Sequence, residues 1–424
     1  MAMFTFSKPE RCYRFGSALF LAFAFFSAIF CGQTRVNNLF HLAALLWLAA
    51  VLTWPPLRRQ LLANRQALWG GGLALMFLLY YSLSALWGET PGDMPSALTH
   101  SAYILLYLVW LVTLLDGERR HHLQWAMLAG ITTLCLYLTL VDAPSIYHLR
   151  ETTARNPGPS NVIDLAGYAA LAILLSLMIF RDTRQKAALC FIPPLLAFMV
   201  LTQSRGPLIA LALAVVVAIP YRQRPGRWLW ILLPVALAVG VVIVYSAIGE
   251  MLLTRFGELY QQSFVRISIW RHSLALIEQA PFFGYGFDKQ LNFLNYTGEL
   301  NHTTHSLYLG ALLKGGCVGF LLLLALLGYG ARLAIAHWRA GRRWEAALFL
   351  FMLVFYSSQG MFVIANPAEF WYLFWLPLAL LLSQPKRRAD GPQQIAAEAD
   401  VMFAIASERR TYPSQTCVLR GLSI

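Results

Sequence analysis

The sequence predicts an all-α integral membrane protein with about twelve transmembrane helices. Of its 424 residues, 58% are hydrophobic, and the mean hydropathy of +0.57 exceeds that of ordinary globular domains. The apolar residues form blocks of about 18–25 residues, which is the length a helix needs to cross a bilayer. Short polar joints separate these blocks, and the blocks lack the two-residue alternation of membrane β-strands.

The expected spans follow one another through most of the chain. They lie at residues 13–31, 37–54, 68–87, 101–115, 121–141, 161–180, 187–203, 206–220, 227–247, 306–331, 345–364 and 369–383. We therefore expect one membrane domain at 1–385, in which 248–304 is a long loop between spans nine and ten. Residues 386–424 form a C-terminal tail to which we assign no function.

The joints alternate in charge along the chain. The basic set comprises "SKPERCYR" (7–14), "RRQLLANR" (58–65), "DGERRHH" (116–122), "RDTRQK" (181–186), "YRQRPGR" (221–227), "HWRAGRRW" (337–344) and "PKRR" (385–388). The other set, poor in lysine and arginine, comprises 32–38, 88–96, 142–160, 203–206, 248–304 and 366–369. With twelve spans every basic joint falls on one side, which the positive-inside rule makes cytoplasmic, together with both termini. The net charge of +13 therefore reflects topology, and we expect no nucleic-acid partner.

Signatures of soluble catalytic modules are absent from the sequence. The six cysteines are scattered, without a CxxC pair, and read as small buried hydrophobic residues. Neither a Walker A motif nor a GxGxxG motif occurs. We expect no cofactor.

The long outer loop, 248–304, is too apolar and aromatic for a disordered segment. Apolar residues recur in it at helical spacing, namely Ile267, Trp270, Leu274 and Ile277. Pro281, followed by Gly284 and Gly286, is expected to end this helix. The pattern predicts an amphipathic helix that lies on, or dips into, the outer membrane interface.

Arginines on the outer side need a reason, because the positive-inside bias disfavours them there. Arg205 occupies the turn between two spans, and Arg266 lies four residues before Trp270 on the same helical face. Arg271 points elsewhere on that helix. The planar fork of a guanidinium matches phosphate oxygens, and it keeps its charge. Arg205 and Arg266 are therefore candidates to bind a lipid-linked phosphate or diphosphate, although pairing with lipid headgroups or nearby carboxylates would also explain each one.

Two histidines precede the tenth span. We expect His305 in the first turn of that helix, where the macrodipole disfavours protonation and favours a bound anion nearby. A neutral imidazole there can act as a base toward a hydroxyl. His302 is expected only to reach the interface, and Thr303 or Thr304 is suited to cap the helix.

Lys314 is a charge about three turns into the same span. Ionisable residues inside the membrane are rare and are candidates for function. Equally, Lys314 could pair within the bundle and position a kink at Gly315–Gly316.

At these residues the chain resembles the superfamily of bacterial O-antigen ligases and polymerases. The resemblance is carried by "LTQSRGPLIALAL" (201–213), "RISIWRHSLALIEQAPFFGYGF" (266–287) and "THSLYLGALLKGGCVGFLLL" (304–323). The family has a T-x-S-R-G-like turn, an R-x-x-x-W…P-x-x-G-x-G segment, and a span that opens H-N/S-x-Y-L and ends in G-x-x-G. The order of these motifs and the long outer loop match as well.

The resemblance implies a metal-independent glycosyltransferase of GT-C-like architecture, active on the periplasmic side of the inner membrane. The ligase branch moves a polysaccharide from undecaprenyl diphosphate onto lipid A–core in lipopolysaccharide biosynthesis. His305 matches the essential histidine of the family, and Arg205 and Arg266 match its essential arginines. Ser306 stands where the family often has Asn, which leaves open what orients the imidazole.

The carboxylates expected on the outer side are not arranged as two rival mechanisms would need. Glycosidases need two convergent acids, but no spacing pairs Asp93, Asp164 and Asp288. A metal-dependent GT-C site would need a carboxylate cluster on the first outer loop, "GQTRVNN", which has none. We therefore expect no metal ion.

Three functions remain open. The ligase reading is favoured over a polymerase or a protein O-oligosaccharyltransferase of the same superfamily. A transporter or flippase is less consistent, because transporters usually carry ionisable residues at mid-membrane and here the charges gather at the outer boundary. The expected partners are an undecaprenyl-diphosphate-linked glycan, a lipid A–core acceptor and the bilayer. The oligomeric state is left open.

Overall fold

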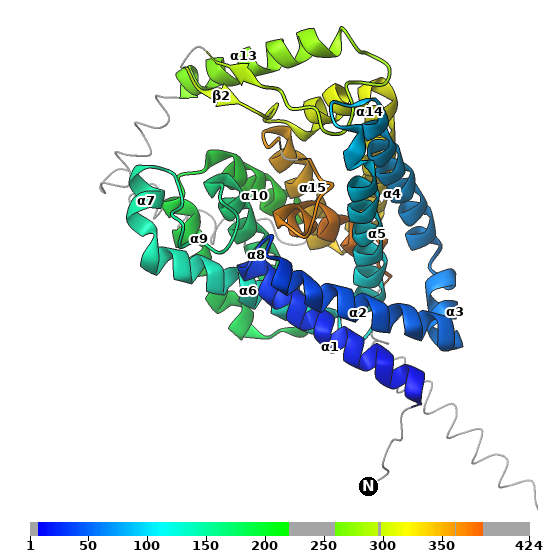
Figure 1. The fold of residues 1–424 in the computed structure, drawn as a ribbon. Coiled ribbons are helices and arrows are strands. Elements are labelled where there is room, and N and C mark those ends of the chain that lie inside the picture. The colour runs from blue at the N-terminus through cyan, green and yellow to red at the C-terminus, as the bar shows by residue number, and fades with distance from the viewer. Residues whose placement is uncertain (1–6, 220–258, 296–297, 361, 385–424) are drawn as a thin grey trace, which may run out of the picture. The chain divides into compact units, whose positions relative to one another are not determined.

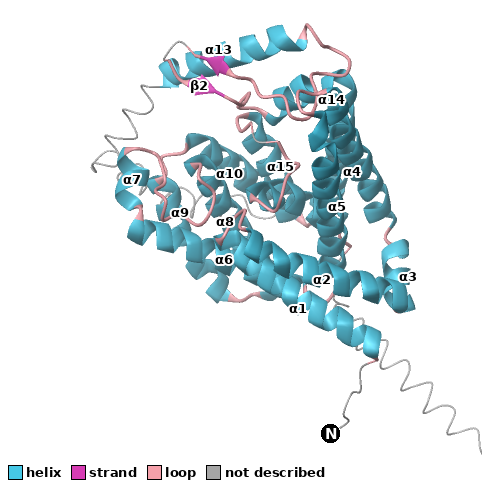
Figure 2. Cartoon of the chain, in the orientation of Figure 1, coloured by secondary structure: helices cyan, strands magenta, loops and turns pink. Residues whose placement is uncertain are grey.

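The computed structural model describes residues 7–219, 259–295, 298–360 and 362–384, and this part of the chain is almost entirely helical (Figures 1 and 2). The helices of its first half are α1 Lys8–Ile29, α2 Thr34–Thr53, α3 Pro55–Ala63, α4 Arg65–Ser84, η1 Ala85–Trp87, η2 Pro91–Asp93, α5 Met94–Asp116, α6 Arg120–Val141, α7 Ala143–His148, α8 Val162–Thr183, η3 Lys186–Phe191, α9 Ile192–Leu201 and α10 Arg205–Ala218.

The second half of the described chain consists of one helix before a small β-hairpin and four helical elements after it. Its elements are α13 Leu259–Ile277, β1 Phe293–Leu294, β2 Leu300–Asn301, α14 Leu307–Arg339, α15 Arg343–Ser357, the π-helical η4 Trp371–Trp375 and α16 Leu376–Leu382. The two short strands are antiparallel, with Phe293 opposite Asn301.

Seven of the described helices are long and apolar enough to cross a membrane, which confirms an all-α membrane protein. They are α1, α2, α4 with η1, η2 with α5, α6, α8 and α14. Shorter apolar helices lie at Lys186–Leu201, Arg205–Ala218 and Trp371–Leu382, and each coincides with an expected span. The expected ninth span, 227–247, and the tail, 386–424, lie outside the described residues.

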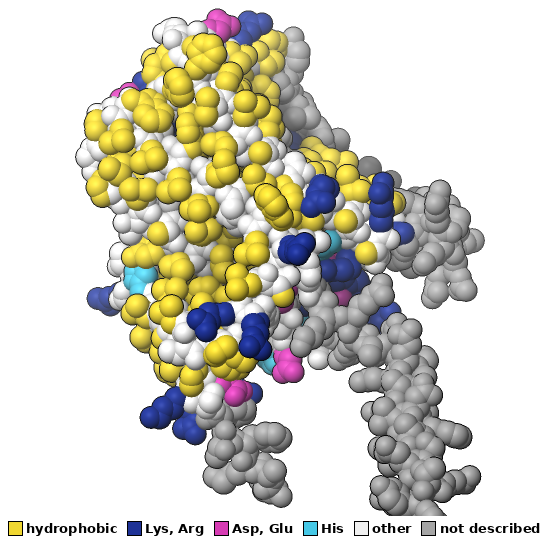
Figure 3. Space-filling view, turned by 90° about the vertical axis from the view of Figure 1, so that its right-hand side faces the viewer, with side chains coloured by type: hydrophobic (Ala, Val, Ile, Leu, Met, Phe, Trp, Pro, Cys, Tyr) yellow, Lys and Arg dark blue, Asp and Glu magenta, His cyan; other side chains and the backbone are white. Residues whose placement is uncertain are grey.

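Large apolar side chains point away from the bundle along the spans. On α4, for example, Trp69 is 70% exposed and Met76 is 56% exposed. Figure 3 shows one face on which yellow side chains dominate a broad area, with few dark blue or magenta ones among them. In water such an apolar surface would drive association between molecules, whereas in a bilayer lipid tails surround it.

The two sets of joints make their contacts separately. Within the set poor in basic residues, Gly32 N donates to Pro367 O at 3.1 Å, and Lys289 pairs with Glu89 at 2.7 Å. Within the basic set, Asn64 at the start of α4 donates to Asp116 at the end of α5 at 2.9 Å. In these contacts each joint meets a joint of its own set, which is consistent with the alternation of charge in the sequence.

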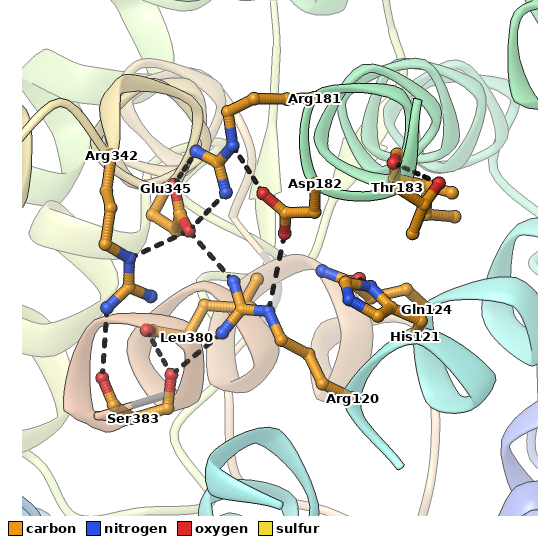
Figure 4. Close-up of polar contacts among 11 residues, drawn as sticks. Arg120, His121, Gln124, Arg181, Asp182, Thr183, Arg342, Glu345, Leu380 and Ser383 are labelled. Atoms are coloured by element: carbon orange, nitrogen blue, oxygen red, sulfur yellow. Dashed lines mark hydrogen bonds and ion pairs between the residues drawn. The ribbon is translucent and has the colours of Figure 1, made fainter. Parts of the chain in front are cut away.

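A buried charge cluster ties helices together at the basic end (Figure 4). Glu345 of α15 is fully buried and accepts from Arg120 of α6 at 2.9 Å. It also accepts from Arg181 of α8 at 2.5 and 2.8 Å and from Arg342 at 3.1 Å. Ser383, at the end of α16, accepts from Arg120 at 3.5 Å. These arginines thus hold four helices together.

α13 ends at Ile277, just before the P-x-x-G-x-G segment, as expected. The segment also fills a break in α14, where Gly316 adopts φ 58° and ψ −162°. Tyr285 N donates to Leu313 O at 3.0 Å, and Cys317 N donates to Pro281 O at 2.8 Å. The loop therefore satisfies backbone groups that the break would otherwise leave unpaired in a membrane-spanning helix.

The buried face of α13 also differs from expectation. Ile269 and Ile277 are buried in a small core with Leu313 of α14. Ile267 and Leu274, which were expected on the same apolar face as Ile277, are 41% and 47% exposed. The helix therefore has apolar residues on two sides, one packed on α14 and one turned outward.

Candidate functional site

Arg205 is the first residue of α10, and a tight buried turn holds it there. Thr202, Gln203 and Ser204 link α9 to α10 and are all less than 5% exposed. Gln203 adopts φ 53° and donates through its side chain to Tyr147 O at 2.7 Å. The T-x-S-R-G motif is thus a compact corner that fixes the direction in which Arg205 leaves the bundle.

His305 lies just before α14, not in its first turn as expected. The N-cap is Ser306 and the helix begins at Leu307, so neither Thr303 nor Thr304 is the cap. His305 itself adopts φ 48°, a left-handed conformation that non-glycine residues seldom occupy. Such strain is stored where the surroundings impose it, often at functional sites.

Gly360 is part of what holds His305 in place. A β-carbon on Gly360 would lie 2.5 Å from the backbone nitrogen of His305 and 2.8 Å from its Cα. The joint between α15 and η4 is therefore packed directly against the backbone of His305. Two residues earlier, Ser358 faces Gly206 beside Arg205, with its Oγ 3.3 Å from where a β-carbon of Gly206 would stand. This joint thus connects the two parts of the site.

Trp270 fixes α13 against the loop that carries the histidine. Its indole Nε1 donates to Thr304 O at 3.1 Å, immediately before His305. Because Arg266 lies one helical turn before Trp270, this bond turns Arg266 toward the histidine. The R-x-x-x-W spacing therefore positions the arginine through the tryptophan.

The charges of the three principal candidates act on one another. Burial, followed by the positive charge of Arg205, lowers the pKa of Arg266. Burial, followed by the positive charge of Arg266, lowers the pKa of His305. Such effects act at short range, so Arg266 lies near both Arg205 and His305, and the joint at 358–360 contacts the backbone beside Arg205 and that of His305. Two adjacent guanidinium groups and a neutral imidazole are suited to bind an anion and accept a proton.

Of the other candidate residues, Lys314 and Ser306 support the local backbone, whereas Arg271 and His302 are exposed. Lys314 donates to Phe287 O at 2.5 Å and to Lys289 O at 2.7 Å, so it anchors the loop at the break in α14. Ser306 caps α14 by position and is buried. Arg271 is exposed, and the exposed imidazole of His302 contacts Asn292 at 2.7 Å.

Sequence reasoning missed two polar supports of this site. Gln359, in the joint beneath His305, donates to the buried Asp164 of α8 at 2.6 Å. Asn301 of β2 contacts His305 Nε2 through its Oδ1 at 3.3 Å. The polar run "SSQG" (357–360), which interrupts the expected span 345–364 and begins at the last residue of α15, was a usable signal for the first. Nothing in the sequence pattern distinguishes Asn301.

Comparison with known proteins identifies a domain in the part of the chain that holds these residues. Residues 188–324, which include all three principal candidates, match the O-antigen ligase family. The chain carries an O-antigen ligase domain. The family recognised from three short motifs is thereby confirmed.

A relative named as an O-antigen ligase extends the similarity beyond this domain. The chain is 26% identical over 328 residues to the O-antigen ligase of Pseudomonas aeruginosa, which covers 72% of this chain and 75% of the relative. The similarity includes much of the helical bundle outside the O-antigen ligase domain. The chain is thus a multi-pass membrane protein that contains an O-antigen ligase domain and is similar to this relative outside it.

Proposed function

We propose that this chain transfers a polysaccharide from undecaprenyl diphosphate to a sugar hydroxyl of lipid A–core. The observation that carries the proposal is the meeting of Arg205, Arg266 and His305 within an O-antigen ligase domain. The basic joints mark the cytoplasmic end by the positive-inside rule, so the site faces the periplasm of the inner membrane.

The proposed reaction is a single displacement that inverts the anomeric carbon. The acceptor oxygen attacks that carbon while His305 takes the hydroxyl proton, and the bond from the anomeric carbon to the diphosphate oxygen breaks. Undecaprenyl diphosphate leaves with the bonding electron pair. Arg205 and Arg266 stabilise the charge that develops on it, which is electrostatic stabilisation of the transition state. The donor carries its own leaving group, so these steps need neither a nucleotide nor a metal ion.

The buried, cation-flanked surroundings of His305 support its role as a base. A base must be unprotonated before it can act, and burial together with Arg266 lowers the pKa of His305. The same arginine that binds the diphosphate thereby keeps the imidazole neutral near pH 7.

Deletion of the gene in its host, with the lipopolysaccharide analysed by gel electrophoresis, tests the proposal. We expect loss of all polymer-capped species and accumulation of undecaprenyl-linked polymer. A core capped with a single repeat would instead indicate a polymerase. Unchanged lipopolysaccharide with an altered periplasmic glycoprotein would indicate protein glycosylation, and loss of polymer from the periplasmic side of the membrane would indicate a flippase.

Replacement of Gly360 by alanine should lower transfer at least about tenfold, because the new methyl group would displace the His305 backbone. Initial rates of the purified chain in detergent measure this. The matched control is Gly328→Ala, since a β-carbon at Gly328 of α14 meets no atom within 4 Å. Equal activity of the two variants would contradict the support that we assign to Gly360.

A further inference from the structure

Asn301 is held so that one end of its side-chain amide faces His305. Its Nδ2 donates to Glu299 O at 3.1 Å, and its Oδ1 lies 3.3 Å from His305 Nε2. A backbone carbonyl only accepts hydrogen bonds, so the NH₂ end of the amide must face Glu299. The oxygen of Asn301 must therefore face the imidazole.

The position of this oxygen selects one tautomer of the imidazole. An amide oxygen only accepts, so the nitrogen opposite it, Nε2, carries a proton. In a neutral imidazole the other nitrogen, Nδ1, then has the free lone pair. Proton acceptance during transfer would occur at Nδ1.

We propose that Asn301 is a positioning residue that fixes the Nε2–H tautomer of His305 and presents Nδ1 to the acceptor hydroxyl. This inference rests on the proposed function, in which His305 is the base. It answers what orients the imidazole in a chain that has Ser306 after the histidine.

The hairpin that carries Asn301 is itself well anchored. Asn301 stands opposite Phe293 in the two-stranded sheet, and Asn295 N donates to Glu299 O at 3.0 Å. At its other side, Leu291 N donates to His302 O at 3.0 Å. These hydrogen bonds fix the backbone that carries the Asn301 amide, which a residue that orients the imidazole of His305 requires.

The 3.3 Å separation has a mechanistic meaning. It exceeds the usual range of about 2.7–3.2 Å for an N–H···O bond. Such contacts are often long before substrate binds, and they shorten when the donor becomes charged. Asn301 would therefore contact the imidazolium more strongly than the neutral ring, and help to stabilise the proton that His305 takes.

The charged groups around His305 are few in the described part of the chain. Arg266 approaches from α13, with Arg205 behind it on α10. Glu299 and the exposed His302 belong to the hairpin. The joint at 358–360 contributes no charged residue. A charge newly placed at position 301 would consequently be the nearest anion to the ring among these groups.

Two substitutions of Asn301 separate positioning from mere structural support. The assay uses full-length chain in detergent, an undecaprenyl-diphosphate-linked oligosaccharide and a lipopolysaccharide core without polymer. Asn301→Ala should lower kcat about tenfold to a hundredfold with little change in KM, because the imidazole loses its orientation. Asn301→Asp should retain most of the rate at alkaline pH, because its carboxylate still accepts from Nε2–H.

The pH dependence of the rate distinguishes positioning from structural support, because loss of a merely structural contact would not shift the acid limb of the profile. A carboxylate beside the ring stabilises the imidazolium and raises the pKa of His305. The acid limb of the Asn301→Asp profile should therefore move about one pH unit or more to higher pH, whereas the limb of Asn301→Ala should not move upward.

The chain offers a matched control in Asn292→Gly, which removes a side chain that contacts a histidine, His302, in the same loop region and tolerates the positive φ of 48° at this position. It should keep wild-type activity and pH dependence. Wild-type behaviour of both Asn301 variants beside an inactive His305→Ala would overturn the inference and leave the proposed function intact. Equal losses in both Asn301 variants without a shifted limb would also overturn it. An active His305→Ala would instead refute the base itself.

Discussion

The His305→Ala variant should lose transfer by about 10²–10⁴-fold while it inserts into the membrane at wild-type levels. The side chain is the proposed proton acceptor, and it lies in the field of Arg266. His305→Asn should be equally inactive, and this variant excludes a backbone explanation. Asparagine adopts positive φ more readily than most residues, so it tolerates the left-handed conformation at position 305.

The matched control for His305 is His302→Ala, three residues earlier in the same loop. His302 is exposed and its ring contacts Asn292, so this variant should retain most activity. Comparable losses at 302 and 305 would show that the loop, not one imidazole, matters. Polymer-capped core on a gel gives the result in cells, and initial rates in detergent give it for the purified chain.

The same histidine predicts the pH dependence of the reaction. Burial and Arg266 lower the pKa of His305 below its ordinary value of about 6.5. The base must be deprotonated, so the rate should rise with pH and reach its plateau from a midpoint below about 6.5. Arg266→Gln removes the nearby positive charge, so its midpoint should move upward while its maximal rate falls. An unchanged midpoint in Arg266→Gln would show that Arg266 does not lower the pKa of His305.

The Glu345→Ala variant should destabilise the folded chain by about 3–5 kcal/mol. Glu345 is fully buried and accepts from three arginines, of which Arg120 is itself buried. Removal of the carboxylate leaves three adjacent arginines without the partner common to all of them, with only Asp182 still beside Arg120 and Arg181 (Figure 4). The midpoint of thermal unfolding of the purified chain in detergent measures the loss.

Glu10→Ala provides the comparison for Glu345. Glu10 pairs with Arg14 in the more exposed part of α1, where the Arg14 side chain is 49% exposed. Exposed pairs of this kind contribute little, so this variant should unfold near the wild-type temperature. Similar midpoints for the two variants would mean that the cluster does not stabilise the bundle.

The sequence by itself determined the class of fold and most of its elements. Ten of the twelve expected spans coincide with candidate membrane helices or shorter apolar helices among the described residues. Hydropathy gives this result because a bilayer demands long apolar helices, and polar joints mark their ends. The spacing of Arg266 and Trp270 on one helical face also survived, because it depends only on the period of the helix.

Tertiary structure decided what local patterns cannot encode. The P-x-x-G-x-G segment reads as a helix stop, but its backbone also fills a break in a helix some thirty residues away. Basic joints read as topology, and only the fold shows that Arg120 and Arg181 share Glu345. Asn301 and Gly360 act on His305 through contacts made when separate elements meet. Periodicity reports which face of a helix is apolar, whereas a site depends on which faces meet, and that is settled by packing among helices far apart in the chain.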